Sequence, residues 1–345
     1  MTTVDLLLAG KTGHGKSSTG NSILKKKVFI PRSTSIAVEV LRNSASFEGK
    51  YVTVIDGFDI DDINFNVTDD VKSVIDLSEK VMSMCQNGFA AVIVTLKFGS
   101  RYTQQEKDAL TVIRSVFGED VLKNYGIIVI THGDHFDANY ENENITFHDW
   151  CKAQTGDIQN LFIECGHRYV LFNNRTTDDN RLSLQNKILM SKVTEIQGKV
   201  PRYTKDDYKQ AALSRRKLFV ISKLSLLEKK TSERMDDINQ HVRRIDNSSY
   251  RLLEDKLADM NNLSRDIVSY KDWLNQEDEG TNSIRQLLLQ ISVTEATIKT
   301  KIKKILFDIE NPPPQEVSDT SNSFQYIFIF GIVACFGLYI LYKFS

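Results

Sequence analysis

Residues Gly10–Ser17, with the sequence GKTGHGKS, constrain the fold of this chain more than any other segment. They fit the pattern GxxxxGK[ST] at each of its fixed positions, directly after the apolar run Val4–Ala9 and before the helix-like stretch Ser17–Leu24. A glycine-rich turn between a strand and a helix binds phosphate, because backbone N–H groups of the turn and of the helix N-terminus point at the anion. The sequence therefore predicts an α/β fold with a phosphate loop at residues 10–17.

Further short apolar runs continue this pattern to about residue 200: Tyr51–Ile55, Ala90–Leu96, Gly126–Thr131 and Arg168–Phe172. The runs are rich in Val, Ile and Leu and lack strict alternation, which is typical of strands covered on both faces. Helix-like stretches such as Val67–Met84 and Thr103–Phe117 lie between them. We therefore expect a domain over residues 1–200 with a mostly parallel sheet flanked by helices.

The residues of the phosphate loop have separate roles in the expected chemistry. Gly13 and Gly15 let backbone amides turn toward the phosphates without obstruction by a Cβ atom. The Lys16 ammonium is expected to reach the β- and γ-phosphates, and the Ser17 hydroxyl to bind Mg²⁺. The other residues predicted to bind nucleotide in and beside this loop are Gly10, Lys11, Thr12, His14 and Ser18.

Two later segments bear on which base the nucleotide carries. The strand-like run before Thr131-His132-Gly133-Asp134 places Asp134 where the [NT]KxD element of GTPases has its aspartate. A carboxylate accepts hydrogen bonds from both N1–H and the 2-amino group of guanine, whereas adenine has an acceptor at N1 and no 2-amino group. Arg168–Phe172 is followed by Asn173 and Asn174, either of which is a candidate for contact with the base. We therefore predict that GTP or GDP binds, with Asp134 and either asparagine on the base and with Thr131 and His132 also in the nucleotide-binding set.

The composition excludes one class of partner and indicates a compartment. The chain has 44 Lys and Arg against 45 Asp and Glu, so it lacks the basic excess of a nucleic-acid-binding protein. Its cysteines, Cys85, Cys151, Cys165 and Cys335, form no CxxC pair and are expected to be reduced thiols in a cytosolic setting. No secretory signal is recognised at the start of the sequence.

From about Tyr203 to Asp308 the sequence is charged and helical in pattern. Apolar residues step mostly by three and four, first at Met235, Ile238, Val242, Ile245 and Leu252, then at Ile284, Leu288, Ile291, Ile298, Ile302 and Ile305. The acidic, glycine-containing stretch Asn275–Asn282 separates the two series. Such stripes pack either as folded-back helices or as an intermolecular coiled coil, and Ser249 and Glu295 interrupt them. We expect a helical or coiled-coil extension over residues 201–310.

A linker and an uncharged segment come next. Residues 311–323 contain Pro312, Pro313 and Pro314 followed by Ser, Thr, Asn and Asp, which is typical of a stiff and then flexible linker. Residues 324–342 carry no charge, and as a helix they would span roughly 28 Å against a hydrocarbon core of about 30 Å. We expect a transmembrane anchor here rather than a buried core helix, with the bulk of the chain in the cytosol. The sequence leaves open whether the membrane is the mitochondrial outer membrane or the endoplasmic reticulum.

In these motifs the chain resembles the GTPases of immunity-associated proteins, a family related to the septins and to the chloroplast-import GTPases. The resemblance covers roughly residues 1–200 and rests on GKTGHGKSSTGNSIL at 10–24, GSRYTQQE at 99–106, FGE at 117–119, THGD at 131–134 and YVLFNN at 169–174. It implies a P-loop G domain that forms homodimers or homo-oligomers when GTP is bound. It also implies that Arg101 corresponds to an arginine that some members supply across the dimer to the partner's nucleotide.

Other positions depart from the usual GTPase pattern. The run Tyr51–Ile55 is followed by Asp56-Gly57-Phe58-Asp59, where GTPases usually have DxxG. Asp56 retains the ability to hold the Mg²⁺ shell through a water molecule, but Asp59 replaces the glycine, and no glutamine follows to orient a water. In the related proteins a switch threonine that binds Mg²⁺ stands at the position of Ala37. Thr34 is the alternative candidate for this role in the nucleotide-binding set.

These features together predict a membrane-anchored, guanine-nucleotide-binding switch or scaffold whose intrinsic GTP hydrolysis is slow or absent. The alternative from a different class is a structural helical tether in which the nucleotide is a fixed ligand. An ATP-using kinase or ATPase is a third possibility, which competition by ATP would reveal.

Overall fold

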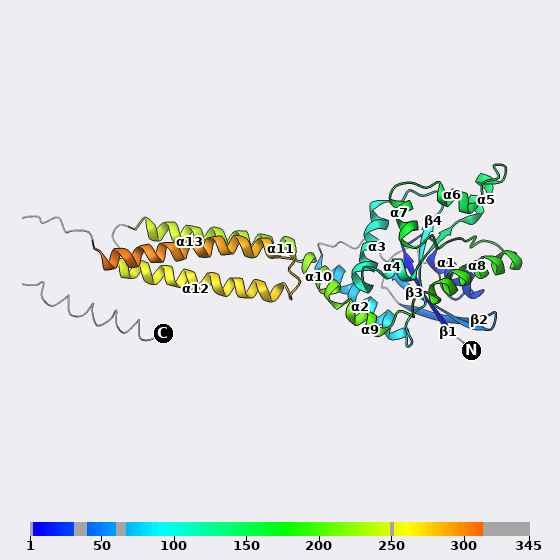
Figure 1. The fold of residues 1–345 in the computed structure, drawn as a ribbon, viewed down its shortest axis with the longest axis horizontal. Coiled ribbons are helices and arrows are strands. Elements are labelled where there is room, and N and C mark those ends of the chain that lie inside the picture. The colour runs from blue at the N-terminus through cyan, green and yellow to red at the C-terminus, as the bar shows by residue number, and fades with distance from the viewer. Residues whose placement is uncertain (1–2, 31–39, 60–66, 249–251, 313–345) are drawn as a thin grey trace, which may run out of the picture. The chain divides into compact units, whose positions relative to one another are not determined.

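The computed structural model describes residues 3–30, 40–59, 67–248 and 252–312 of the chain (Figure 1). Two compact units are distinguished by their internal contacts. The first comprises residues 1–239 and 267–294 and contains the sheet, and the second comprises residues 240–266 and 295–345.

A six-stranded sheet forms the centre of the first unit, in the order β2-β3-β1-β4-β5-β6. Its strands are β1 (Thr3–Gly10), β2 (Leu41–Phe47), β3 (Lys50–Asp59), β4 (Ala91–Lys97), β5 (Gly126–Thr131) and β6 (Tyr169–Leu171). All neighbouring pairs are parallel except β2 and β3, which are antiparallel. The residues at 6–9 and 127–130 are almost completely buried, as expected for parallel strands covered on both faces. The predicted α/β fold with a mostly parallel sheet is confirmed.

Helices cover both faces of this sheet. Helices α1 (Lys16–Leu24) and α8 (Asp179–Gln197) lie on one face, and α2 (Thr68–Met84) and α3 (Gln104–Phe117) lie on the other (Figure 1). Shorter helices connect the later strands: α4 (Val121–Tyr125), α5 (Gly133–Tyr140), α6 (Phe147–Lys152) and α7 (Asp157–Glu164). Because β3, β1, β4, β5 and β6 are parallel, their carboxyl ends share one edge of the sheet. Ligands bind at this edge in open α/β sheets.

Strand β2 and the length of β3 were not predicted from the sequence. Residues 41–47 mix half-buried polar and small side chains, so no apolar run marks a strand there. The pairing with β3 and the tight turn at Glu48 and Gly49, which have φ of 44° and 76°, stabilise this edge strand. Strand β3 also continues beyond its predicted end at Ile55, because its pairing with β1 extends to Asp59 opposite Gly10.

The segment that follows residue 200 is built into the core of the first unit. Tyr203 is 3% exposed, and its backbone forms hydrogen bonds in both directions with Phe89, each 3.0 Å long. The Tyr203 ring stacks on Phe89 with centroids 4.5 Å apart, and its hydroxyl donates to the Phe117 carbonyl at 2.9 Å. Helices α9 (Lys205–Gln210) and α10 (Ala212–Ser222) follow, and α10 packs against α2 and α3. The domain boundary predicted at residue 200 thus lies just before a segment that packs with the sheet domain.

This packing makes Gly88 sensitive to substitution. Gly88 has φ of +74°, and a Cβ atom there would lie 1.9 Å from the Tyr203 carbonyl oxygen. Gly88→Ala is expected to lower the free energy of unfolding by roughly 3 kcal/mol, because backbone must move on one side of the contact. Urea unfolding of the whole chain, followed by tryptophan fluorescence, measures this loss.

Gly49→Ala is the matched control for this substitution. Gly49 has nearly the same φ, +76°, but a Cβ atom there would meet nothing within 4 Å. It should therefore cost only the backbone strain of about 1–2 kcal/mol. Equal losses in the two variants would show that strain, and not the contact with Tyr203, limits position 88.

The charged region after residue 223 forms the helices α11 (Leu224–Asp246), α12 (Leu253–Glu277) and α13 (Arg285–Glu310). In the first unit, their buried apolar residues include Met235, Ile238, Leu274, Ile284 and Ile291. In the second unit, they include Val242, Ile245, Met260 and Ile298, and Lys301 Nζ lies 2.6 Å from Asp246 Oδ2. Of the two predicted arrangements, the structure has helices folded back within one chain.

The helical pattern differs from the prediction at two points. Helix α11 ends at Asp246, so Leu252 does not continue its stripe and is 69% exposed. In α13, Leu287 is buried in place of the predicted Leu288. Residue 249 lies outside the described residues. The predicted break at 275–282 is confirmed, since it overlaps the turn between α12 and α13.

No helix within the described ranges combines the length and apolar character needed to cross a membrane. The predicted transmembrane segment 324–342 and most of the linker 311–323 lie outside those ranges.

Candidate nucleotide-binding site

The phosphate loop connects β1 to α1, as predicted. Gly10 ends β1 with φ of +136°, and a Cβ atom there would lie 2.7 Å from the Thr95 hydroxyl oxygen. Gly15 caps α1 in the left-handed region with φ of +85°. Both conformations strongly favour glycine, so the local backbone explains two fixed positions of the motif. The N-terminus of α1 is thereby left facing the loop, where its N–H groups are available to an anion.

Lys16 and Ser17 begin α1 at the carboxyl edge of the sheet. Lys16 is 5% exposed, and its ammonium donates to the Gly10 carbonyl at 2.7 Å, so the charge is held inside the loop. The Ser17 hydroxyl donates to Asp56 Oδ2 at 2.7 Å, and Asp56 is 6% exposed. A hydroxyl and a carboxylate on neighbouring elements are oxygen donors of the kind that Mg²⁺ uses. The residues present fit a Mg²⁺ ion beside the phosphates, with Ser17 as a ligand and Asp56 behind it.

The end of β5 is tied to the phosphate loop. The Thr131 hydroxyl donates to the His14 carbonyl at 3.0 Å and lies 3.0 Å from His132 Nδ1. When the single hydroxyl hydrogen is directed to the His14 carbonyl, Nδ1–H of the neutral imidazole is the donor to Thr131. Burial, followed by the charges of Lys97 and His135, lowers the pKa of His132, which favours that neutral form. The imidazole therefore presents an uncharged ring at this edge of the sheet.

Asp134 lies in the first turn of α5, where a carboxylate is favoured by the helix dipole. Its side chain is 28% exposed, and Oδ2 lies 3.7 Å from Arg175 Nη1 and 3.8 Å from His135 Nε2. The carboxylate is thus reachable from solvent on the same edge as the phosphate loop. Asp134 follows β5 as predicted, and its contact with the base stays a prediction.

The two asparagines after β6 have different surroundings. Asn174 donates from Nδ2 to the Thr19 hydroxyl at 3.0 Å and accepts at Oδ1 from the Ser22 hydroxyl at 2.9 Å, so its amide is bound to α1. Asn173 is 9% exposed, and its Oδ1 accepts from the Arg175 backbone N–H at 2.9 Å. Both residues shape the loop beside Asp134. A contact of either amide with the base stays a prediction.

The remaining predicted site residues are distributed around the loop. Thr12 and Ser18 are half-buried, and Lys11 donates from Nζ to Gln105 in α3. Arg101 is exposed in the connection between β4 and α3. Thr34 and Ala37 lie outside the described residues, and the side chain of Asp59 is likewise not described.

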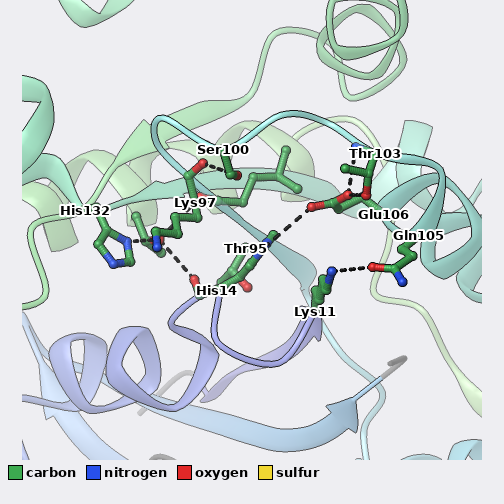
Figure 2. A network of polar contacts seen from close by, with 12 residues as sticks. Lys11, His14, Thr95, Lys97, Ser100, Thr103, Gln105, Glu106 and His132 are labelled. Atoms are coloured by element: carbon green, nitrogen blue, oxygen red, sulfur yellow. Dashed lines mark hydrogen bonds and ion pairs between the residues drawn. The ribbon is translucent and has the colours of Figure 1, made fainter. Parts of the chain in front are cut away.

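One side chain at this site was not singled out from the sequence. Glu106 in the first turn of α3 is only 5% exposed and lies 3.6 Å from His14 Nε2 of the phosphate loop (Figure 2). The spacing Thr103-x-x-Glu106 is the signature of a capping box, so the sequence indicated a helix start there. It gave no sign that the same carboxylate contacts the phosphate loop.

Comparison with known proteins finds relatives that are named as immune-associated nucleotide-binding proteins. Immune-associated nucleotide-binding protein 8 of Arabidopsis thaliana is 30% identical over 185 residues, covering 52% of this chain and 50% of that protein. Immune-associated nucleotide-binding protein 7 of the same plant is 25% identical over 281 residues, covering 80% of each chain. The chain thus spans about half the length of the first of these relatives.

Among solved structures, Toc33 from Arabidopsis thaliana in complex with Mg²⁺ and GMPPNP is similar over 56% of this chain and 86% of its own, with 15% identity and a TM-score of 0.39. The sequence also matches the AIG1 family over residues 4–220, which is more than half of its 345 residues. That range begins in β1 and ends in α10, and it confirms the resemblance predicted from the motifs: the chain belongs to the AIG1 family.

Proposed function

We propose that this chain is a guanine-nucleotide-binding switch or scaffold that self-associates through its G domain when GTP is bound. The observation that carries the proposal is the convergence of Lys16, the Ser17–Asp56 pair and Asp134 on one edge of the sheet. A nucleoside triphosphate requires a lysine inside the phosphate loop and a pair of oxygen donors for Mg²⁺. It also requires a group that contacts the base, and the carboxylate after β5 is the candidate for that contact. The names of the curated relatives, which describe them as nucleotide-binding, support the same class of ligand.

Guanine is favoured over adenine by the chemistry of Asp134. When ionised, its carboxylate only accepts hydrogen bonds, and guanine offers two adjacent donors where adenine offers an acceptor and no amino group. The weak contacts to Arg175 and His135, each longer than 3.5 Å, leave its oxygens able to receive those donors. Mg²⁺ bound through Ser17 would supply charge neutralisation at the β- and γ-phosphates.

The rate of hydrolysis is proposed to be slow in the isolated chain. Asp59 stands where a glycine usually senses the γ-phosphate, and Ile60 follows where a water-orienting glutamine would be expected. A carboxylate near the γ-phosphate repels it unless the side chain turns away. Self-association that brings Arg101 of a second copy to the nucleotide would add a positive charge that stabilises the transition state of hydrolysis. Anchoring through residues 324–342 would hold this G domain at a membrane surface.

Turnover by the full chain should therefore depend on protein concentration. We expect the rate of phosphate release per molecule to rise by at least about tenfold as the chain is concentrated, since an arginine supplied across a dimer stabilises transition-state charge. Arg101→Ala should abolish this rise and leave nucleotide binding unchanged. Arg265→Ala, an exposed arginine on α12, is the control and should keep it. Fast release from dilute protein would contradict a slow intrinsic rate.

The elution volume in size-exclusion chromatography separates the switch from a structural tether. A switch should elute as a larger species with a GTP analogue than with GDP. Coincident profiles would favour a tether in which the helices α11, α12 and α13 are the working surface and the nucleotide is a fixed ligand.

A further inference from the structure

Two side chains of the phosphate loop, those of Lys11 and His14, reach the start of α3 (Figure 2). Lys11 Nζ donates to Gln105 Oε1, and His14 Nε2 lies 3.6 Å from Glu106 Oε1. His14 is 8% exposed and Glu106 is 5% exposed, so this second contact is almost shielded from water. Two side chains of the phosphate loop therefore contact the first turn of α3.

The Glu106 carboxylate serves two partners through its two oxygens. Oε1 faces His14, whereas Oε2 accepts the Thr103 backbone N–H at 2.8 Å and also contacts the Thr103 hydroxyl. A carboxylate that is withdrawn from water is stable only when its oxygens have such partners. Movement of His14 therefore changes the balance of contacts that hold Thr103.

Thr103 is one end of the short connection that carries Arg101. At its other end, Phe98 is 6% exposed and packs against Phe136 and Trp150 with ring centroids 5.3 Å and 5.4 Å away. Ser100 forms a tight turn, because its backbone N–H and hydroxyl both donate to the Lys97 carbonyl. Only a few residues separate the Phe98 anchor from the Thr103 anchor, so a shift at Thr103 redirects the exposed Arg101 between them.

The backbone of His14 is also bonded to Thr131 at the end of β5. Its carbonyl accepts from the Thr131 hydroxyl at 3.0 Å, three residues before Asp134. The main chain of one residue thus contacts the end of β5, while its side chain contacts α3. Ordering of the loop by phosphate would fix His14 from its backbone, and Glu106 would pass that constraint to Thr103.

We propose that Glu106 is a positioning residue that couples occupancy of the phosphate loop to the conformation of residues 98–103. The proposal rests on the proposed nucleotide binding. Nucleotide orders the loop, His14 is held against Oε1, and Oε2 holds the Thr103 end of the connection that presents Arg101. Without the carboxylate, the phosphate loop and this connection become independent of each other.

Hydrogen exchange of the full chain tests this coupling, read by mass spectrometry with and without a GTP analogue. In the unaltered chain, the analogue should slow exchange in peptides covering residues 98–103. Glu106→Gln retains an oxygen acceptor for the Thr103 N–H but loses the charge facing His14, so the slowing caused by the analogue should disappear. His14→Gln should have the same effect. The dissociation rate of a fluorescent GDP should rise about fivefold in both variants, as expected for loss of roughly 1 kcal/mol.

Glu164→Gln is the matched control, because Glu164 forms an ion pair with Arg114 at the other end of α3, with Nη2 and Oε2 2.6 Å apart. It removes a carboxylate of α7 that contacts the same helix, α3, and should keep the slowing by nucleotide. If Glu106→Gln keeps it as well, Glu106 is only a helix cap and the coupling is refuted. Absence of fluorescent-GDP binding by the unaltered chain would instead refute the proposed nucleotide binding itself.

Discussion

Lys16→Ala is expected to lower the affinity of the chain for GDP and for a GTP analogue by about 10³-fold. The Lys16 ammonium lies inside the phosphate loop, 2.7 Å from the Gly10 carbonyl, and is 5% exposed. A charge-assisted hydrogen bond contributes roughly 1.5–3 kcal/mol, and a lysine that reaches both the β- and γ-phosphates forms two of them. Alanine offers no replacement, because its side chain has no hydrogen-bond donor and no charge.

Lys25→Ala is the control for the loss of one positive charge. Lys25 lies at the other end of α1 and donates from Nζ to the Ser183 hydroxyl at 2.7 Å on the surface. We expect its affinity to change by less than about twofold, since exposed charges at such distance are screened by salt. Titration with a fluorescent GDP measures both variants. Retained affinity in Lys16→Ala would contradict the assignment of residues 10–17 as the phosphate site.

Asp134→Asn is expected to weaken guanine nucleotide binding by about 10²-fold or more and to create binding of xanthosine nucleotide. The carboxylate accepts from two donors of guanine, whereas an asparagine amide accepts one and opposes the other with its own N–H₂ group. An unpaired polar contact in a binding site costs roughly 1–3 kcal/mol in addition to the hydrogen bond that is lost. Xanthine has a carbonyl at position 2, which the amide N–H₂ can donate to.

Competition of GDP and xanthosine diphosphate for a fluorescent nucleotide measures this exchange of specificity. Asp137→Asn makes the same chemical change within α5, where Asp137 pairs with Arg181 on the surface. It should leave the preference for guanine intact, because surface ion pairs contribute little. An equal loss of guanine affinity in both variants would show that the charge of this helix, and not the geometry of Asp134, selects the base.

The site could be predicted to different extents in its different parts. The phosphate loop was evident because its fixed glycines and Lys16 are required by local backbone geometry and charge, which act over a few neighbouring residues. Asp134 was singled out because it follows a strand-like apolar run in the position of the [NT]KxD aspartate, and its contact with the base stays a prediction. Asn173 and Asn174 were both candidates for a base contact, and the sequence did not show that the Asn174 amide forms hydrogen bonds with Thr19 and Ser22, which are about 150 positions away in the chain. Only the packing of α1 against the loop after β6 reveals that pairing.

The helical extension illustrates the same limit. The stripe of apolar residues predicted helices and the break near residues 275–282, yet it did not show that α11 ends at Asp246. An apolar stripe specifies that a helix face must be covered, but several partners satisfy that requirement equally. Burial of Ile245 and Ile298 within the second unit decided that the helices fold back in one chain.

The sequence by itself determined the phosphate loop, the buried strands and the position of Asp134 directly after one of them. These depend on local backbone conformation and on runs of apolar side chains, which are properties of short segments. Only the tertiary structure decided that β2 joins the sheet edge, that Tyr203 belongs to its core and that Glu106 lies between His14 and Thr103. Each of these depends on contacts between segments distant in sequence, whose partners no local pattern specifies.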